Sequence, residues 1–593
     1  CFQPALKLLQ VLHAEPSVRK VVTHKAWVSL GLMHQLSRQL DDPLSIATGV
    51  LPDWCSVLMR QSRQLFGFEA RKKYFMLTAF GPSRAIAWFQ AQQIAEAEAA
   101  AASGQGRSDP RTPRGASTGP APIPVLGALT VALVQISRHN FLDQAARLLE
   151  THAKDRRELR VEWEGEPGTG KGVWPEFFSK TATELRRRWK PTGRSEHEAH
   201  EEHMAVLPRL WVDGEEGSGS EGDFVDLELF PRPMVASVDD PEATLSWFRF
   251  LGRLLAKALL DSRQDCVRMV PLPLHPLFFE LLVEQLPFFT QQERWAALGR
   301  LAADPAWPGS ALITGAIAVA SESPVGSSIE PYTQGLSVDE WLGCACFEDP
   351  VTCMPLKHEG ASQTLNLANI KEFLDLIFDV WLGDGVARQI ETCRQGFAEV
   401  TSARASIPSR LLGSLAEQTA AYTYSRRPTA TLVASLQIFT AVELQQLLCG
   451  KVEVEWSLQQ LRRTVKPGYG THISACANRA VALALFYRHC VPVLTAMCLV
   501  SLVLHCNAAY TDTDKAYVWL LEELDAMDQQ ERSAFLSFVT SSPRLPPGGL
   551  GQLPKGAIVV CHVLRVLLRP TRSRRVLHEI NMSRLHTPWC NHR

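Results

Sequence analysis

The stretch TLSWFRFLGRLLAKALLD, residues 244–261, carries the clearest helical pattern in the chain. Its apolar side chains recur at three- and four-residue spacing, at Trp247, Leu251, Leu254 and Ala258. Polar side chains occupy the opposite face, at Ser246, Arg249, Arg253 and Lys257. An amphipathic helix of this kind buries its apolar face against other elements. The stretch therefore predicts the central helix of a folded core.

Three further regions downstream predict helices that can pack against this one. Residues 369–382 and 386–400 are both amphipathic and are separated by a glycine-rich turn, so they predict a helical hairpin. Residues 435–450 predict a single helix that ends at Gly450. Residues 515–540 predict two helical runs joined by a turn.

The sequence before the central helix adds one strand pattern and two helical regions. Residues 159–178, LRVEWEGEPGTGKGVWPEFF, alternate as a strand does, turn through glycines and continue as an aromatic-rich helix. Residues 126–159 predict helix, and residues 1–90 predict several helices broken by turns. Residues 91–125 are rich in Ala, Gly, Ser and Pro and predict a flexible linker. The expected fold class is therefore α+β, mainly helical.

Composition favours a globular protein without a nucleic-acid or membrane partner. The 593 residues suggest several folded units, and 46% hydrophobic content is sufficient for buried cores. Sixty-one basic side chains nearly balance 62 acidic ones, for a formal charge of -1, so no global field attracts nucleic acid or an anionic membrane. The apolar stretch 491–504 contains Pro492 and is short for a membrane span.

Cysteine usage and the N-terminus favour an intracellular protein, in the cytoplasm, the nucleus or both. Fourteen cysteines are scattered without a repeating spacing, as is typical of reduced proteins. The N-terminus lacks the basic, apolar and small-residue sections of a signal peptide. Because the chain starts at Cys1 with a helical pattern, we expect it to be a fragment of a longer protein.

Four motifs suggest a nucleotide, a metal or nucleic acid, and each has a simpler interpretation. Residues 165–172 resemble a phosphate-binding loop, but Gly172 stands where a hydroxyl would bind magnesium, so a glycine turn is favoured. Two cysteine and histidine groups lack the ligand set of a closed zinc site: Cys344, Cys346 and Cys353, and His586, Cys590 and His592. The basic run at residues 569–575 lacks interleaved aromatic residues. We therefore expect no metal and no cofactor.

Several segments resemble, in the same order, the HECT-type ubiquitin ligases, and within them the branch of ubiquitin-fusion-degradation and thyroid-receptor-interacting ligases. VEWEGEPGTGKGVWPEFF is similar to the family's first strand and glycine turn, and FRFLGRLLAKALLDSR to its central helix. The later blocks are GVARQIETCRQGF, ELQQLLCG, PGYGTH and LLEELDAMDQQERSAFLSFVTSSPRLPPGGL. Upstream, LSRQLDDPLSIATGVLPDW resembles the segment that precedes the HECT domain in that branch.

The resemblance implies a bilobal fold and ubiquitin-protein transferase activity. Such a ligase accepts ubiquitin from a ubiquitin-conjugating enzyme as a cysteine thioester and passes it to lysines of a protein substrate. This exchange depends on a thiolate and on accurate positioning. The residues that the resemblance assigns to an apolar groove for the conjugating enzyme are Leu444, Leu447, Leu448, Tyr469, Trp519 and Leu520. The alternative that some of these are core residues stays open.

The resemblance is weakest at the C-terminus. Family members carry a Thr-Cys signature followed by aliphatic residues, and from Cys561 onwards the sequence no longer follows that pattern. Cys590, in the context of Thr587 and Asn591, is the candidate thioester nucleophile, whereas Cys561 is interpreted as a buried thiol. Only 45 residues run from Gly549 to the end, so the catalytic lobe is expected to be truncated or aberrant. A catalytically inactive HECT-like protein that docks a conjugating enzyme or a substrate is the alternative.

These assignments give the expected domain boundaries. They are a helical segment at 1–90, the linker at 91–125, the large subdomain of the N-lobe at 126–440 with variable loops at 191–223 and 401–435, a conjugating-enzyme-binding subdomain at 441–541, a hinge at 542–549 and a remnant C-lobe at 550–593. The hinge residues are Pro543, Pro546, Pro547, Gly548 and Gly549. Residues 473–509 interrupt the family's pattern and, with the unusual C-terminus, suggest an error in the gene model.

Overall fold

The computed structural model describes most of the chain between residues 3 and 560. The described residues are 3–15, 18, 21–81, 84–90, 93–94, 131–155, 157–166, 173–186, 208–213, 227–234, 240–262, 268–284, 290–321, 335–401, 432–467, 515–553 and 559–560. Most of the predicted linker and of the two variable loops, the whole of 473–509 and the last 33 residues (561–593) lie outside this set.

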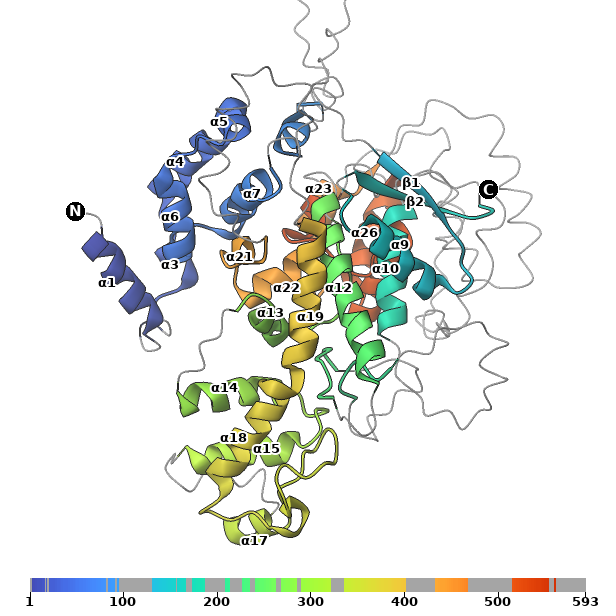
Figure 1. The fold of residues 1–593 in the computed structure, drawn as a ribbon. Coiled ribbons are helices and arrows are strands. Elements are labelled where there is room, and N and C mark those ends of the chain that lie inside the picture. Colours follow the sequence, from blue (N-terminus) through green and yellow to red (C-terminus); the bar gives the residue numbers. More distant parts are fainter. Residues whose placement is uncertain are drawn as a thin grey trace, which may run out of the picture.

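The described residues up to 90 fold as helices joined by turns, as predicted. They comprise α1 Gln3–Ala14, α3 His24–Trp27, α4 Leu30–Leu40, α5 Pro43–Thr48, α6 Asp53–Gln61, the short 3-10 helix η1 Arg63–Leu65 and α7 Phe68–Thr78. Pro43 stands in the first turn of α5, where its missing N–H breaks no helical bond, and Gly49 ends that helix with a φ of 70°. In Figure 1 this outer layer lies beside the centre of the molecule, with α7 close to α21.

A small β-α-β unit follows, and it corrects one prediction. Residues expected to be helical form strand β1 Val131–Ile136, which pairs in parallel with β2 Glu158–Trp163 through the crossover helix α9 Phe141–His152. The burial of β1 alternates along the strand with a period of two, which is typical of a strand and not of the predicted helix. The predicted strand at 159–163 and the helix after the glycine turn, α10 Val173–Leu185, are confirmed.

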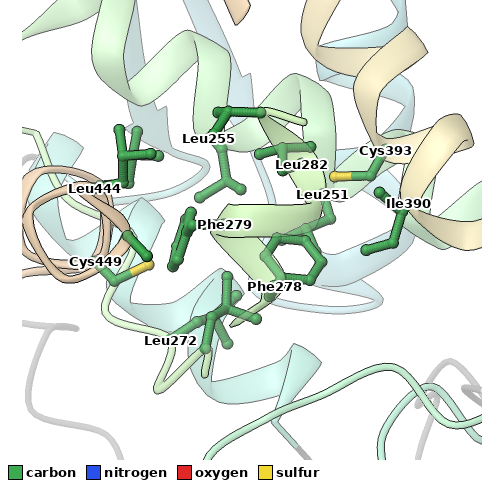
Figure 2. Close-up of a cluster of buried hydrophobic side chains, with 14 of the residues drawn as sticks. Leu251, Leu255, Leu272, Phe278, Phe279, Leu282, Ile390, Cys393, Leu444 and Cys449 are labelled. Atoms are coloured by element: carbon green, nitrogen blue, oxygen red, sulfur yellow. The ribbon is translucent and has the colours of Figure 1, made fainter. Parts of the chain in front are cut away.

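The predicted central helix is α12 Pro241–Asp261, and it crosses α19 Asp384–Thr401 at very short range. A β-carbon on Gly252 would lie 1.9 Å from the carbonyl oxygen of Cys393, and one on Gly396 would lie 2.0 Å from that of Arg249. The two backbones therefore touch at paired glycines. Around this crossing, α13 Pro276–Leu282 supplies Phe278 and Phe279 to the core that Figure 2 shows.

The polar face predicted for α12 is wrong at one position. Lys257 is 1% exposed, and its ammonium donates to the carbonyl oxygens of Asp155 and Arg157. It also lies 3.6 Å from the fully buried carboxylate of Asp261. Helical spacing alone placed Lys257 with Arg249 and Arg253, but the β-α-β unit covers this end of the helix, so the lysine is enclosed.

The helical hairpin is confirmed and extends into a peripheral unit. α18 Ile370–Trp381 packs on α19, and with α14 Gln291–Leu301, α15 Ser310–Ala320 and α17 Val338–Gly343 it forms the lower end of the molecule in Figure 1. Within this unit the Nε1 of Trp381 donates to the buried carboxylate of Asp349 at 2.7 Å. In the part of the chain that the structure describes, no helix is both long and apolar enough to cross a membrane.

A second, smaller hydrophobic cluster is built from the segments after Gly450. Its helices are α23 Leu458–Thr464, α26 Lys515–Ala526, α27 Gln529–Thr540 and the 3-10 helix η3 Gly549–Gln552. The two helical runs predicted at 515–540 are therefore confirmed. A short strand, β3 Lys466–Pro467, pairs in parallel with β4 Val559–Val560. The fold is thus α+β and mainly helical, as expected.

Candidate functional site

The helix that carries three predicted partner-binding leucines is separate from the one before it. In place of one helix over 435–450, the structure has α21 Leu432–Leu436 and α22 Ala441–Cys449. Thr440 begins α22 because its side chain accepts from the backbone N–H of Glu443, while the Glu443 carboxylate accepts from the backbone N–H of Thr440. The helical spacing of apolar residues continues from α21 into α22, so the sequence signal for the break between them is the capping box at Thr440 and Glu443.

Leu444, Leu447 and Leu448 point into the protein. Their side chains are 0%, 2% and 1% exposed. α22 packs against α13, and Figure 2 shows Leu444 with Phe279 in the same cluster of side chains. Their burial agrees with the alternative that some of the predicted partner-binding residues belong to the core.

Of the other three residues of the predicted groove, Leu520 is the one whose side chain is described. Leu520 is half-buried on α26 and packs against that cluster. Trp519 lies on the same helix, but only its backbone is described, and Tyr469 is outside the described residues. Among the four side chains that the structure describes, three are enclosed in the main core and Leu520 packs on the second cluster, so these four do not form one exposed surface.

The chain that leads into the predicted hinge is held by three separate parts of the fold. The hydroxyl of Ser179 on α10 donates to the carbonyl oxygen of Ser541 at 2.5 Å. The guanidinium of Arg544, 9% exposed, donates to the carbonyl oxygen of Leu272 at 3.2 Å. The backbone N–H of Lys451 donates to the carbonyl oxygen of Leu545 at 2.9 Å.

Gly450 makes this close approach possible. It has a φ of 79°, and a β-carbon there would lie 2.9 Å from the Cβ of Arg544 and 3.0 Å from the Sδ of Met269. Gly450 was predicted only as the end of α22, a role that it also fills. Arg544 was missed altogether, because its partner Leu272 is 272 residues away and nothing in the local pattern announces it.

The predicted hinge residues themselves are mostly enclosed. Pro546 and Pro547 are buried and Pro543 is half-buried, whereas Gly548 is exposed. Gly548 and Gly549 have φ values of 95° and 74°, which favour glycine. Leu545 before them and Leu550 after them both belong to the second hydrophobic cluster. A pivoting motion at this place would have to break those contacts. The predicted hinge is therefore packed against the second hydrophobic cluster.

Comparison with known proteins finds sequence similarity to one family. The model of the HECT-domain (ubiquitin-transferase) family matches residues 498–573. The chain is 28% identical over 559 residues to the E3 ubiquitin-protein ligase UPL3 of Arabidopsis thaliana, covering 90% of this chain and 24% of UPL3. It is 24% identical to the E3 ubiquitin-protein ligase TRIP12 of Danio rerio and 23% identical to ubiquitin fusion degradation protein 4 of Saccharomyces cerevisiae, covering 92% and 94% of this chain and 23% and 29% of those proteins.

This chain is a relative of the HECT ubiquitin ligases. The relatives confirm the branch that the sequence indicated, that of ubiquitin fusion degradation protein 4 and TRIP12. The chain spans between about a fifth and three tenths of the length of the curated relatives that it matches (19% to 29%). The HECT match includes α26, α27, the predicted hinge and Cys561, whereas Cys590 lies beyond it.

The cysteines of this HECT relative differ sharply in their surroundings. Cys393 and Cys449 are buried in the main core, and burial raises the pKa of each thiol to about 12. Burial also raises the pKa of Cys55 to about 11. Cys344 and Cys353 are exposed. Among the described residues, no three His, Cys, Asp or Glu side chains are grouped so that they could hold a metal ion.

We expect alkylation at pH 8 to separate these cysteines. Cys344 and Cys353 should react readily with iodoacetamide, since both are exposed. Cys393 and Cys449 should stay unmodified in the folded protein, because they are buried and a thiol of pKa about 12 is roughly one part in ten thousand thiolate at that pH. Peptide mass spectrometry measures each site, with a urea-denatured sample as the control. Equal rates at Cys393 and Cys344 in the folded protein would contradict this packing.

Proposed function

We propose that the chain acts in ubiquitin transfer as a HECT-type ubiquitin-protein ligase, accepting ubiquitin from a conjugating enzyme and passing it to lysines of a protein substrate. The proposal rests on sequence similarity to curated proteins of the ubiquitin ligase family. The matches cover 89% to 94% of this chain. A mainly helical body with a buried central helix and a second cluster near the HECT match agrees with it.

The proposed chemistry is two successive acyl transfers. A cysteine thiolate of the chain attacks the carbonyl carbon of the thioester between ubiquitin and the conjugating enzyme, and the enzyme's thiolate leaves. The amine of a substrate lysine then attacks the new thioester, loses a proton, and the chain's thiolate leaves. Because one thioester replaces another in the first step, positioning and the thiolate fraction determine the rate.

We propose Cys590 as the nucleophile, with Cys561 as the next candidate. Two of the described cysteines are poor candidates for the nucleophile. Cys393 and Cys449 are enclosed in the core, and the pKa values of their thiols are strongly raised. The exposed pair, Cys344 and Cys353, lies in the peripheral unit, outside the HECT match.

We further propose a bilobal organisation in which the N-lobe extends to Val560. The pairing of β4 Val559–Val560 with β3 supports this boundary, because it returns the chain to the body after the predicted hinge. The remnant C-lobe would then begin after residue 560, rather than at 550, and the joint between lobes would follow β4. The segment 542–549 would then stay bound to the N-lobe and would not act as the joint.

A docking surface for the conjugating enzyme has two candidate places. The first is the set of residues that the resemblance implied, of which Leu520 on α26 has a described side chain. The second is the peripheral unit, which exposes three large apolar side chains: Leu336 at 46%, Met354 at 41% and Leu367 at 54%. Exposed apolar side chains that form a contiguous patch are typical of interaction sites. Comparing Leu520→Ala with Leu367→Ala in binding of the conjugating enzyme distinguishes the two places.

The transfer activity is tested by loading a conjugating enzyme with ubiquitin, adding the full chain and running a non-reducing gel. We expect an adduct that reductant removes, that Cys590→Ala abolishes and that Cys561→Ala retains. An adduct that survives Cys590→Ala and disappears in Cys561→Ala would move the nucleophile to Cys561. No adduct with the unaltered chain would refute the transfer activity and leave the non-catalytic docking protein.

A further inference from the structure

The helices of residues 24–90 are attached to the part of the protein that follows residue 130, here called the body. Arginine side chains make the attachment at two places. At the first, the guanidinium of Arg63 donates from Nη1 to the carbonyl oxygens of both Gln437 and Phe439, each at 2.7 Å. These carbonyls belong to the corner between α21 and α22. Arg63 therefore bonds to that corner from more than 370 residues away.

Arg71 on α7 makes the same attachment deeper in the protein. Its side chain is 1% exposed, and it forms a two-pronged ion pair with Glu443, with Nη1–Oε2 and Nη2–Oε1 distances of 2.7 and 2.5 Å. Nη1 also donates to the carbonyl oxygen of Ile438 at 2.8 Å. Burial alone would raise the pKa of Glu443, but the hydrogen bonds and charge of Arg71 outweigh it and lower that pKa.

Aromatic packing surrounds the same corner. The ring of Phe439 lies between two rings of α7, with centroid distances of 5.9 Å to Phe68 and 5.6 Å to Phe75. Phe68, Arg71 and Phe75 are spaced by three and four residues and share one face of α7. A charged side chain in the apolar stripe of a helix is the sequence signal that marks this contact.

The second attachment joins the segment to the end of the central helix. Arg84 donates from Nη1 to the carbonyl oxygen of Leu260 at 2.6 Å. Its Nη2 lies 3.6 Å from the carboxylate of Asp261, whose side chain has no exposed surface. The upstream segment thus supplies cations to two buried or half-buried carboxylates of the body, Glu443 and Asp261.

We propose that the α21–α22 corner and the C-terminal end of α12 form a binding surface for residues 24–90, and that this surface holds the segment even as a separate polypeptide. Along the chain, residues 91–130 connect this segment to the rest of the protein. Removing one partner of a buried, hydrogen-bonded ion pair leaves the other charged and unpaired, which weakens an interface severely. The inference is independent of ubiquitin transfer, since it concerns how the body is assembled.

The test uses the full chain, folded intact and then cut. A protease recognition sequence replaces residues 106–112, the purified chain is cleaved, and size-exclusion chromatography at physiological salt follows the two pieces. We expect them to elute together at the volume of the uncut chain. Separation of the pieces from the unaltered sequence at micromolar concentration would overturn the proposal.

Two variants test whether the arginines carry the binding. In Arg63→Ala/Arg71→Ala, we expect the cleaved pieces to bind roughly a hundred-fold more weakly and to separate, because Glu443 and three carbonyls lose the hydrogen bonds that the two arginines donate. Arg38→Ala, at an exposed position on α4, is the matched control and should co-elute as the unaltered protein does. Co-elution of the double variant would contradict the role of the arginines.

A gentler variant keeps the test decisive if the double variant does not fold. Glu443→Gln preserves the shape of the side chain but removes its charge, so the cleaved pieces should dissociate at least about ten-fold more readily. Binding unchanged by this substitution would show that the ion pair with Arg71 does not contribute.

Discussion

Gly252→Ala is expected to destabilise the protein by about 3 kcal/mol or more, because the new methyl group meets backbone rather than a movable side chain. Its β-carbon would lie 1.9 Å from the carbonyl oxygen of Cys393 and 2.8 Å from the backbone nitrogen of Phe397. Relief requires α12 and α19 to move apart, which opens the core on both sides. Gly396→Ala should behave alike, since its β-carbon would lie 2.0 Å from the carbonyl oxygen of Arg249.

The measurement is the free energy of unfolding by urea, followed by helical circular dichroism. Gly299→Ala is the matched control: the residue lies within α14, and its β-carbon would meet only the Cδ1 of Ile317, at an ordinary 3.6 Å. Alanine has a higher helix propensity than glycine, so this variant should be as stable as the unaltered protein or slightly more stable. Equal stability of the Gly252 and Gly299 variants would show that the two helices do not cross as described.

Asp261→Ala is expected to cost about 3 to 5 kcal/mol, because it leaves two cations enclosed without their carboxylate. Lys257 and Arg84 each lie 3.6 Å from Asp261, and the Lys257 side chain is 1% exposed. The carboxylate also accepts from the backbone N–H of Leu159 at 3.4 Å, which links α12 to β2. The substitution therefore weakens both the central helix and its attachment to the strand pair.

A double substitution distinguishes unpaired charge from lost volume. Replacing the buried pair by apolar side chains, in Lys257→Met/Asp261→Leu, should recover part of the lost stability, because Lys257 no longer remains buried without the carboxylate, while Arg84 keeps its hydrogen bond to Leu260. Urea unfolding of the two variants gives the comparison. If the double variant were less stable than Asp261→Ala, the carboxylate would act mainly through its other contacts, and the ion pair would not be the cause.

Periodic patterns predicted the elements whose partners are close in the sequence. The helical hairpin of α18 and α19 was foreseen because Val386, Ile390, Cys393, Phe397 and Val400 repeat at helical spacing, and all five are buried. The two helices α26 and α27 were foreseen for the same reason. The similarity to HECT ligases, assembled from ordered blocks, was confirmed by the comparisons.

What the sequence did not predict depends on partners far along the chain. Lys257 was assigned to solvent because helical spacing does not show that β2 and α9 cover that end of α12. Leu444 was assigned to a groove because an amphipathic helix looks the same whether its apolar side meets a partner or its own core. Pro546 and Pro547 suggested a joint, yet Arg544 and Leu545 fix the chain just before them.

We propose that the folded protein recognises a ubiquitin-loaded conjugating enzyme, whichever cysteine accepts the ubiquitin. The most direct test is fluorescence anisotropy of a labelled conjugating enzyme, linked stably to ubiquitin, titrated with the full chain. We predict saturable binding that Cys590→Ala leaves unchanged within about two-fold. Absence of saturable binding to the folded chain, under conditions in which a known HECT ligase binds, would contradict the account.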